Sequence, residues 1–167
     1  MTRKTDAENL LDCYWGPRAR RSEEAHYFVA TKFSAVNRGL SYAVVVFGVV
    51  TGSGLFATLS KQNKTLQLGL AVASLVAAGI VAYQRSAEYA ARSVDHQRSG
   101  ADWGVIVNEI EELRKQIQSR DPKDAELDRL RKEMDTVTKR SPQIPQYWFD
   151  KCKIGETYMY PAPSDQP

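Results

Sequence analysis

The sequence predicts an all-α membrane protein: a transmembrane helical hairpin with an N-terminal amphipathic helix and a cytoplasmic helical hairpin. The main observation is that residues 39–60 and 65–84, which are 22 and 20 residues long, contain no charged side chain. As helices each would be roughly 30 Å long, about the thickness of the hydrocarbon core of a bilayer. Only four polar residues separate them, and heptad-spaced apolar residues follow. The two stretches therefore predict a hairpin that crosses the membrane twice.

A soluble protein with two buried helices is the alternative to this interpretation. The mean hydropathy of −0.45 would suit it, but the polar segments 1–38 and 85–167 dilute the two apolar runs. A chain of 167 residues offers too small a shell to bury two such helices. We therefore favour the membrane interpretation.

Residues 1–38 are predicted to form N-terminal cytoplasmic helices. A short amphipathic helix over residues 5–15 carries Leu10, Leu11, Tyr14 and Trp15 on one face, and the Gly16-Pro17 pair is expected to end it. Ser22 is expected to cap a second helix that leads into the membrane.

Small residues recur at spacings that place them on one face of each membrane helix. Such stripes allow close approach of helix backbones in lipid. They either hold the hairpin together or form contacts between subunits, and the sequence leaves both open. The residues concerned are Ser41, Gly48 and Gly52 in the first helix and Gly69, Ala73 and Ala77 in the second.

Neither membrane stretch contains Asp, Glu, Lys, Arg or His, which argues against coupled transport. The polar groups are hydroxyls, and Thr51 and Thr58 lie on one side of the first helix, seven residues apart. These hydroxyls either line a pore or bond to their own backbone. A pore lined by them would discriminate poorly among ions.

Residues 85–140 are predicted to form cytoplasmic helices with two apolar seams, separated by a helix start at Asp121-Pro122 and preceded by a break at Gly100. The seams are narrow, so we expect them to need further partners and to serve assembly. The seam residues are Ile106, Ile110, Leu113 and Ile117, followed by Leu127, Leu130, Met134 and Val137.

Residues 141–167 form a tail rich in proline and aromatic residues. The cluster in it is too apolar for a disordered segment. We expect it to fold back on the cytoplasmic helices, with docking of a partner protein as the alternative. The docking residues are Ile144, Tyr147, Trp148 and Phe149.

The distribution of charge predicts the orientation and excludes several functions. Arginines flank both outer ends of the hairpin, which places both termini in the cytoplasm of a multi-pass protein of the cell membrane. No segment is basic enough for nucleic-acid binding. No catalytic, cofactor or metal motif is present, so we expect neither an enzyme nor a cofactor, and His96 is expected at the surface.

The order of these parts resembles the SLATT domain family over residues 5–155. The resemblance rests on the layout and on the segments RSAEY at 85–89, WGVIVNEI at 103–110 and SPQIP at 141–145, with His96 and Tyr147. These two-transmembrane proteins are found beside nucleotide-synthesising and nucleotide-sensing genes in prokaryotic conflict systems. The resemblance implies an effector that oligomerises and breaches the membrane when a partner detects a virus or a nucleotide signal.

Three functions are therefore considered. The first is a homo-oligomeric pore-forming effector of antiviral defence, which would have the lipid bilayer, further copies of itself and a nucleotide-sensing or nucleotide-synthesising protein as partners. The second is a membrane scaffold that recruits a partner without conducting ions. The third is a small channel or transporter unrelated to defence.

Overall fold

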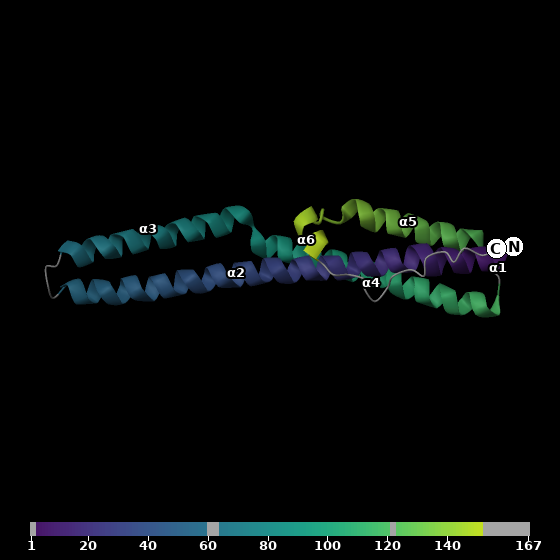
Figure 1. Ribbon diagram of the computed structural model, residues 1–167, viewed down its shortest axis with the longest axis horizontal. Coiled ribbons are helices and arrows are strands. Elements are labelled where there is room, and N and C mark those ends of the chain that lie inside the picture. The colour runs from purple at the N-terminus through teal and green to yellow at the C-terminus, as the bar shows by residue number, and fades with distance from the viewer. Residues whose placement is uncertain (1–2, 60–63, 121–122, 152–167) are drawn as a thin grey trace. The chain divides into compact units, whose positions relative to one another are not determined.

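The computed structural model describes residues 3–59, 64–120 and 123–151, and every element in these ranges is a helix (Figure 1). The prediction of an all-helical fold is confirmed for this part of the chain. The elements are α1 (Arg3–Asn9), the π-helix η1 (Leu10–Trp15), α2 (Gly16–Leu59), α3 (Lys64–Ala87), α4 (Tyr89–Ser119), α5 (Asp124–Arg140) and α6 (Gln146–Lys151).

The chain divides into two compact units. The bundle unit contains residues 1–30 and 94–167, and the hairpin unit contains residues 31–93. The hairpin unit is longer than the predicted membrane hairpin, 39–84, because α2 and α3 continue beyond their uncharged stretches.

Gly16 and Pro17 do not end the first helix, contrary to the sequence expectation. The Gly16 N–H donates to the Leu11 carbonyl five residues earlier, so a π turn widens the helix just before proline. A Cβ on Gly16 would lie 2.8 Å from that carbonyl oxygen, so this turn needs a glycine. Ser22 is not a cap either: its hydroxyl donates to the Arg18 carbonyl inside α2, at 2.9 Å.

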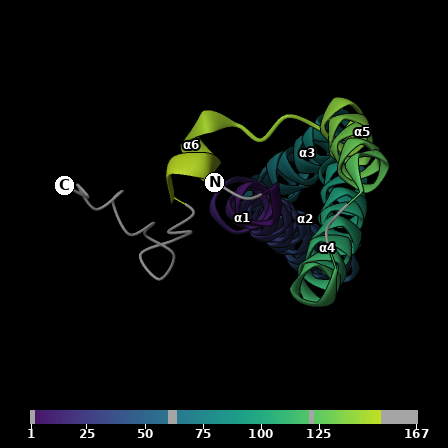
Figure 2. The same cartoon turned by 90° about the vertical axis from the view of Figure 1, so that its right-hand side faces the viewer.

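The core of the bundle unit contains the two predicted apolar seams. Figure 2 shows α1, α4 and α5 around it. The seam residues of α4 and α5 are buried, apart from the partly buried Leu127, and Ala7, Leu11, Ala19 and Trp103 complete the cluster. The expectation that the seams need another chain is therefore wrong, because the N-terminal helical segment of the same chain covers them.

Gly100 does not break α4. The break lies instead at Glu88, whose φ of 52° places it in the left-handed region that non-glycine residues rarely adopt. Gly100 continues the helix and makes room for a neighbouring ring, since a Cβ there would lie 3.1 Å from Tyr27 ring atoms.

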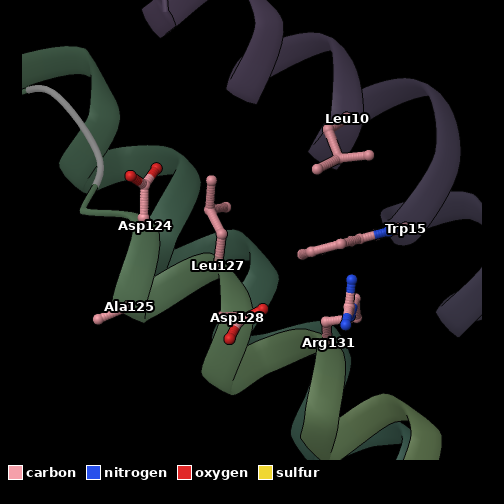
Figure 3. A pocket seen from close by; sticks show the side chains of 7 residues that line it. All are labelled: Leu10, Trp15, Asp124, Ala125, Leu127, Asp128 and Arg131. Carbon is pink, nitrogen blue, oxygen red and sulfur yellow. The ribbon is translucent and has the colours of Figure 1, made fainter.

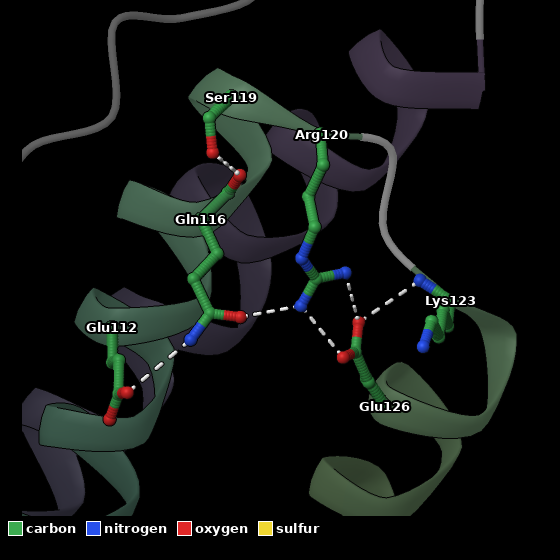
Figure 4. Close-up of polar contacts among 6 residues, drawn as sticks. All are labelled: Glu112, Gln116, Ser119, Arg120, Lys123 and Glu126. Carbon is green, nitrogen blue, oxygen red and sulfur yellow. Dashed lines mark hydrogen bonds and ion pairs between the residues drawn. The ribbon is translucent and has the colours of Figure 1, made fainter.

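The start of α5 is stabilised by Glu126, and the expected helix start at Asp121 and Pro122 lies outside the described residues. The Lys123 N–H donates to Glu126 Oε2 at 3.1 Å, and the Arg120 guanidinium donates to both carboxylate oxygens at 2.8 and 2.7 Å (Figure 4). These bonds lower the pKa of Glu126 to about 2, with the Arg120 bond contributing most.

Candidate membrane-spanning surface

The hairpin unit is held together by a seam with the 4-3 spacing of a heptad. Within the hairpin, buried and half-buried positions recur at this spacing on both helices, as expected when two antiparallel helices pack side by side. On α2 they are Phe33, Asn37, Leu40, Val44, Phe47 and Thr51, and on α3 they are Leu70, Ala73, Ala77, Ile80, Gln84 and Ala87.

A polar clasp closes this seam at its base. The Gln84 side-chain amide donates to Asn37 Oδ1 at 2.7 Å, to the Asn37 carbonyl at 3.3 Å and to Ser41 Oγ at 2.9 Å. The Ser41 hydroxyl in turn donates to the Asn37 carbonyl at 2.9 Å. Ser41 thus contacts the second helix through Gln84, a partner that the small-residue pattern did not indicate.

The other small residues divide into two groups. Ala73 and Ala77 lie in the seam between α2 and α3. At Gly48, Gly52 and Gly69 an added Cβ would meet nothing within 4 Å. These glycines therefore do not bring the two helices of the hairpin together, and Gly48 and Gly69 lie on its outer surface.

The hydroxyls of Thr51, Ser53 and Ser74 bond to the backbone of their own helices. Thr51 donates to the carbonyls of Phe47 at 2.8 Å and Gly48 at 3.1 Å, and Ser53 donates to the Val49 carbonyl at 2.7 Å. The Ser74 hydroxyl donates to the Leu70 carbonyl at 2.9 Å. The side chain of Thr58 lies outside the described residues.

The outer surface of the hairpin is apolar. Within the described residues, two helices are long and apolar enough to cross a membrane, and only 6% of the most apolar 18-residue window is buried in each. Val45, Val49 and Leu75 expose 61%, 63% and 75% of their surface. A core helix of a soluble protein would have most of this surface covered by other parts of the chain.

A buried histidine pair joins α2 and α4 in the bundle unit. The Nδ1 atoms of His26 and His96 lie 2.9 Å apart, so one ring donates its N–H to the other. Both side chains are buried, and the expectation of a surface His96 is wrong. Burial lowers the pKa of His26 to about 4, and the neighbouring His96 adds a smaller decrease. Burial also lowers the pKa of His96, although the Asp95 charge acts in the opposite direction.

An open pocket of about 370 Å³ lies between η1 and α5 (Figure 3). Leu127 points toward Leu10 across it, and the Arg131 guanidinium lies beside the Trp15 ring. In the part of the chain that the structure describes, no three His, Cys, Asp or Glu side chains are grouped to hold a metal ion. The pocket thus combines one aromatic face with charged side chains but has no ligand set for a metal.

The tail returns to the bundle unit at Trp148. Its ring packs edge-on against Phe28 of α2, with centroids 6.4 Å apart, and Tyr147 packs on Trp148 at 5.1 Å while remaining 59% exposed. Ile144 is half-buried, and the side chain of Phe149 lies outside the described residues. Trp148 thus contacts α2, whereas Tyr147 is largely exposed.

No family model, curated protein or solved structure matches this chain.

Proposed function

We propose that the hairpin of α2 and α3 spans the cell membrane with both termini in the cytoplasm. The observation that carries this proposal is the apolar outer surface, which water would not stabilise over two helices of this length. Arginines at both open ends of the hairpin favour the cytoplasmic side for the bundle unit.

We further propose that several copies assemble through the outer glycine faces and permeabilise the membrane, as an effector of a prokaryotic antiviral or conflict system. Two packed helices cannot enclose a channel by themselves, so permeation needs more than one copy. Gly48 and Gly52 leave open backbone surface where a second hairpin can approach closely. The link to defence, and to a nucleotide-sensing or nucleotide-synthesising partner, is supported by the SLATT resemblance.

A non-conducting scaffold is the second candidate, and one observation favours it. The hydroxyls of Thr51, Ser53 and Ser74 are bonded to backbone carbonyls, so they offer little polar lining to a pore. In this function the hairpin would anchor the bundle unit, whose surface would recruit another protein.

The orientation is tested by labelling single cysteines in intact cells. In a variant with Cys13 and Cys152 replaced by serine, Asn63→Cys should react with a membrane-impermeant maleimide added outside. A variant that keeps Cys152 alone should react only after the cells are permeabilised. Labelling of Cys152 with protection of Asn63→Cys would reverse the orientation.

Permeabilisation is tested by dye release from liposomes and by membrane depolarisation in cells that overproduce the protein. Replacing Gly48 and Gly52 by isoleucine keeps the helix apolar but adds bulk to the glycine face, so insertion should persist while leakage falls. Gly79→Ile is the matched control, because its added Cβ also meets nothing within 4 Å but lies off this face. Equal leakage from the double variant and the native chain would exclude the glycine face, and an inserted native protein that never leaks would favour the scaffold.

A further inference from the structure

We propose that Arg38 and Arg85 bind the phosphate of an anionic phospholipid at the base of the hairpin. Both side chains are exposed, and neither forms an ion pair within the described residues. The proposal rests on the membrane insertion argued above and adds a lipid class and a site to it.

The polar clasp places the two arginines at one height. Asn37 and Gln84 face each other across the seam, at 2.7 Å between Oδ1 and Nε2. Arg38 directly follows Asn37, and Arg85 directly follows Gln84. Each arginine side chain is therefore rotated by about 100° around its helix axis, away from the seam. Because the helices are antiparallel, these two turns lead to the same side of the hairpin. With helix axes roughly 8–10 Å apart, both guanidinium groups can contact one anion.

The surface on the membrane side of this pair is apolar and aromatic. Tyr42 and Val45, four and seven residues after Arg38, are 66% and 61% exposed, and Val81, four residues before Arg85, is 44% exposed. Residues at these helical spacings lie on the same face as the arginines. Acyl chains can pack on these side chains while the headgroup phosphate contacts the arginines, and tyrosine is common at this depth in membranes. A soluble phosphate would gain nothing from the apolar part.

No ion pair within the described residues balances the charge of the arginine pair. Glu88 is the acidic residue nearest to Arg85 in the sequence, but it makes no ion pair with it and follows the end of α3. Two neighbouring guanidinium groups repel each other, and an anion between them removes this repulsion. Arginine also donates two parallel N–H bonds to a phosphate group. A zwitterionic headgroup accepts such bonds too, but its net charge of zero gives less attraction.

Native mass spectrometry of the full chain in detergent, with added phosphatidylglycerol or phosphatidylcholine, tests this site. The native protein should retain phosphatidylglycerol in preference to phosphatidylcholine. Arg38→Gln with Arg85→Gln should retain it about tenfold less, as the charge-assisted hydrogen bonds are lost. Arg98→Gln with Arg131→Gln, which makes the same change of net charge in the bundle unit, should retain it like the native chain.

Three results would overturn the site. They are equal retention of the two lipids by the native chain, equal retention of phosphatidylglycerol by both double variants, and displacement of the lipid by inorganic phosphate, which would indicate a soluble anion site. Carbonate extraction from pure phosphatidylcholine vesicles distinguishes failure of the lipid site from failure of the proposed membrane insertion. There the native chain and the Arg38→Gln, Arg85→Gln variant should both stay in the membrane, and release of the native chain would refute insertion itself.

Discussion

Acidification should destabilise the bundle unit through its buried histidine pair. His26 is neutral in the folded chain because its pKa is lowered from 6.5 to about 4. In the unfolded chain it takes up a proton below pH 6.5. Its contribution to stability is therefore present above pH 6.5 and is lost as the pH falls toward 4. The full loss is about 3 kcal/mol, from roughly 2.5 pKa units at 1.36 kcal/mol each.

The loss at pH 5 can be measured before most carboxylates titrate. Between pH 7.5 and 5 we expect a fall of about 2 kcal/mol in the free energy of unfolding, since pH 5 is roughly 1.5 units below the unfolded pKa. Urea unfolding of the full chain in detergent, followed by the fluorescence of buried Trp103, reports on this unit. The Asp95 charge acts on His96 and raises its pKa against the effect of burial. Ser93 and Ser99, three residues before and after His96 on α4, are also buried.

The His26→Gln variant is the matched control, because glutamine keeps an amide that can bond to His96 but does not titrate. It should lose clearly less stability than the native chain over the same pH range, and His26→Gln with His96→Gln should lose the least. If the native chain and the double variant show the same loss between pH 7.5 and 5, the histidine pair does not set the acid sensitivity.

Three further substitutions address the bundle unit. Ile110→Ala should reduce the free energy of unfolding by about 2–5 kcal/mol, the usual cost of a cavity at a buried position, and urea unfolding at neutral pH measures it; a change below the error of the fit would mean that the seam is not packed as described. Gly16→Ala should reduce the free energy of unfolding by about 1–3 kcal/mol, because its Cβ would lie 2.8 Å from the Leu11 carbonyl oxygen. The melting temperature should fall accordingly, and an unchanged melting temperature would show that the π turn relaxes freely. Glu126→Gln should flatten the stability profile between pH 4.5 and 2, since the lowered pKa of Glu126 gives stability that is present above pH 4.5 and lost toward pH 2; a profile identical to that of the native chain would argue against the Arg120 bond in solution.

The sequence predicts the helices well where periodicity or length determines them. The uncharged stretches 39–60 and 65–84 correspond to the apolar parts of α2 and α3, and the heptad-spaced residues of α4 and α5 lie in the core. These features follow from hydrophobicity at a fixed spacing, which is a local property of the sequence. The all-helical prediction is therefore correct for local reasons.

The sequence reasoning fails where a partner distant in the chain decides the outcome. Ala7 and Ala19 are too small to indicate a core-facing helix, yet they lie in the core that covers the two seams. His26 and His96 are 70 positions apart, so no spacing pattern could pair them. A glycine–proline pair ends most helices. At Gly16 and Pro17 the helix continues because of the π turn closed by the Leu11 carbonyl, which the sequence pattern does not reveal.

The small-residue pattern and the seam of the hairpin share only some positions. In the second helix Ala73 and Ala77 lie in the seam, whereas Gly69 lies on the outer surface. In the first helix the glycines were chosen because they allow close approach, whereas Val44 and Phe47 form the seam. A 4-3 count extended beyond both apolar stretches would find this seam, which begins at Phe33 and includes three polar residues, Asn37, Thr51 and Gln84.

The Asn37–Gln84 clasp also limits how the hairpin can change shape. A slide of α3 along α2 by one turn, about 5.4 Å, would separate the two amides and break the hydrogen bonds between them. The hydrogen-bonded pair at one level of a mostly apolar seam thus favours a single register of the two helices. Opening of the proposed channel would then come from tilting or rotating whole hairpins as rigid pairs, because a piston-like movement of one helix past the other is disfavoured.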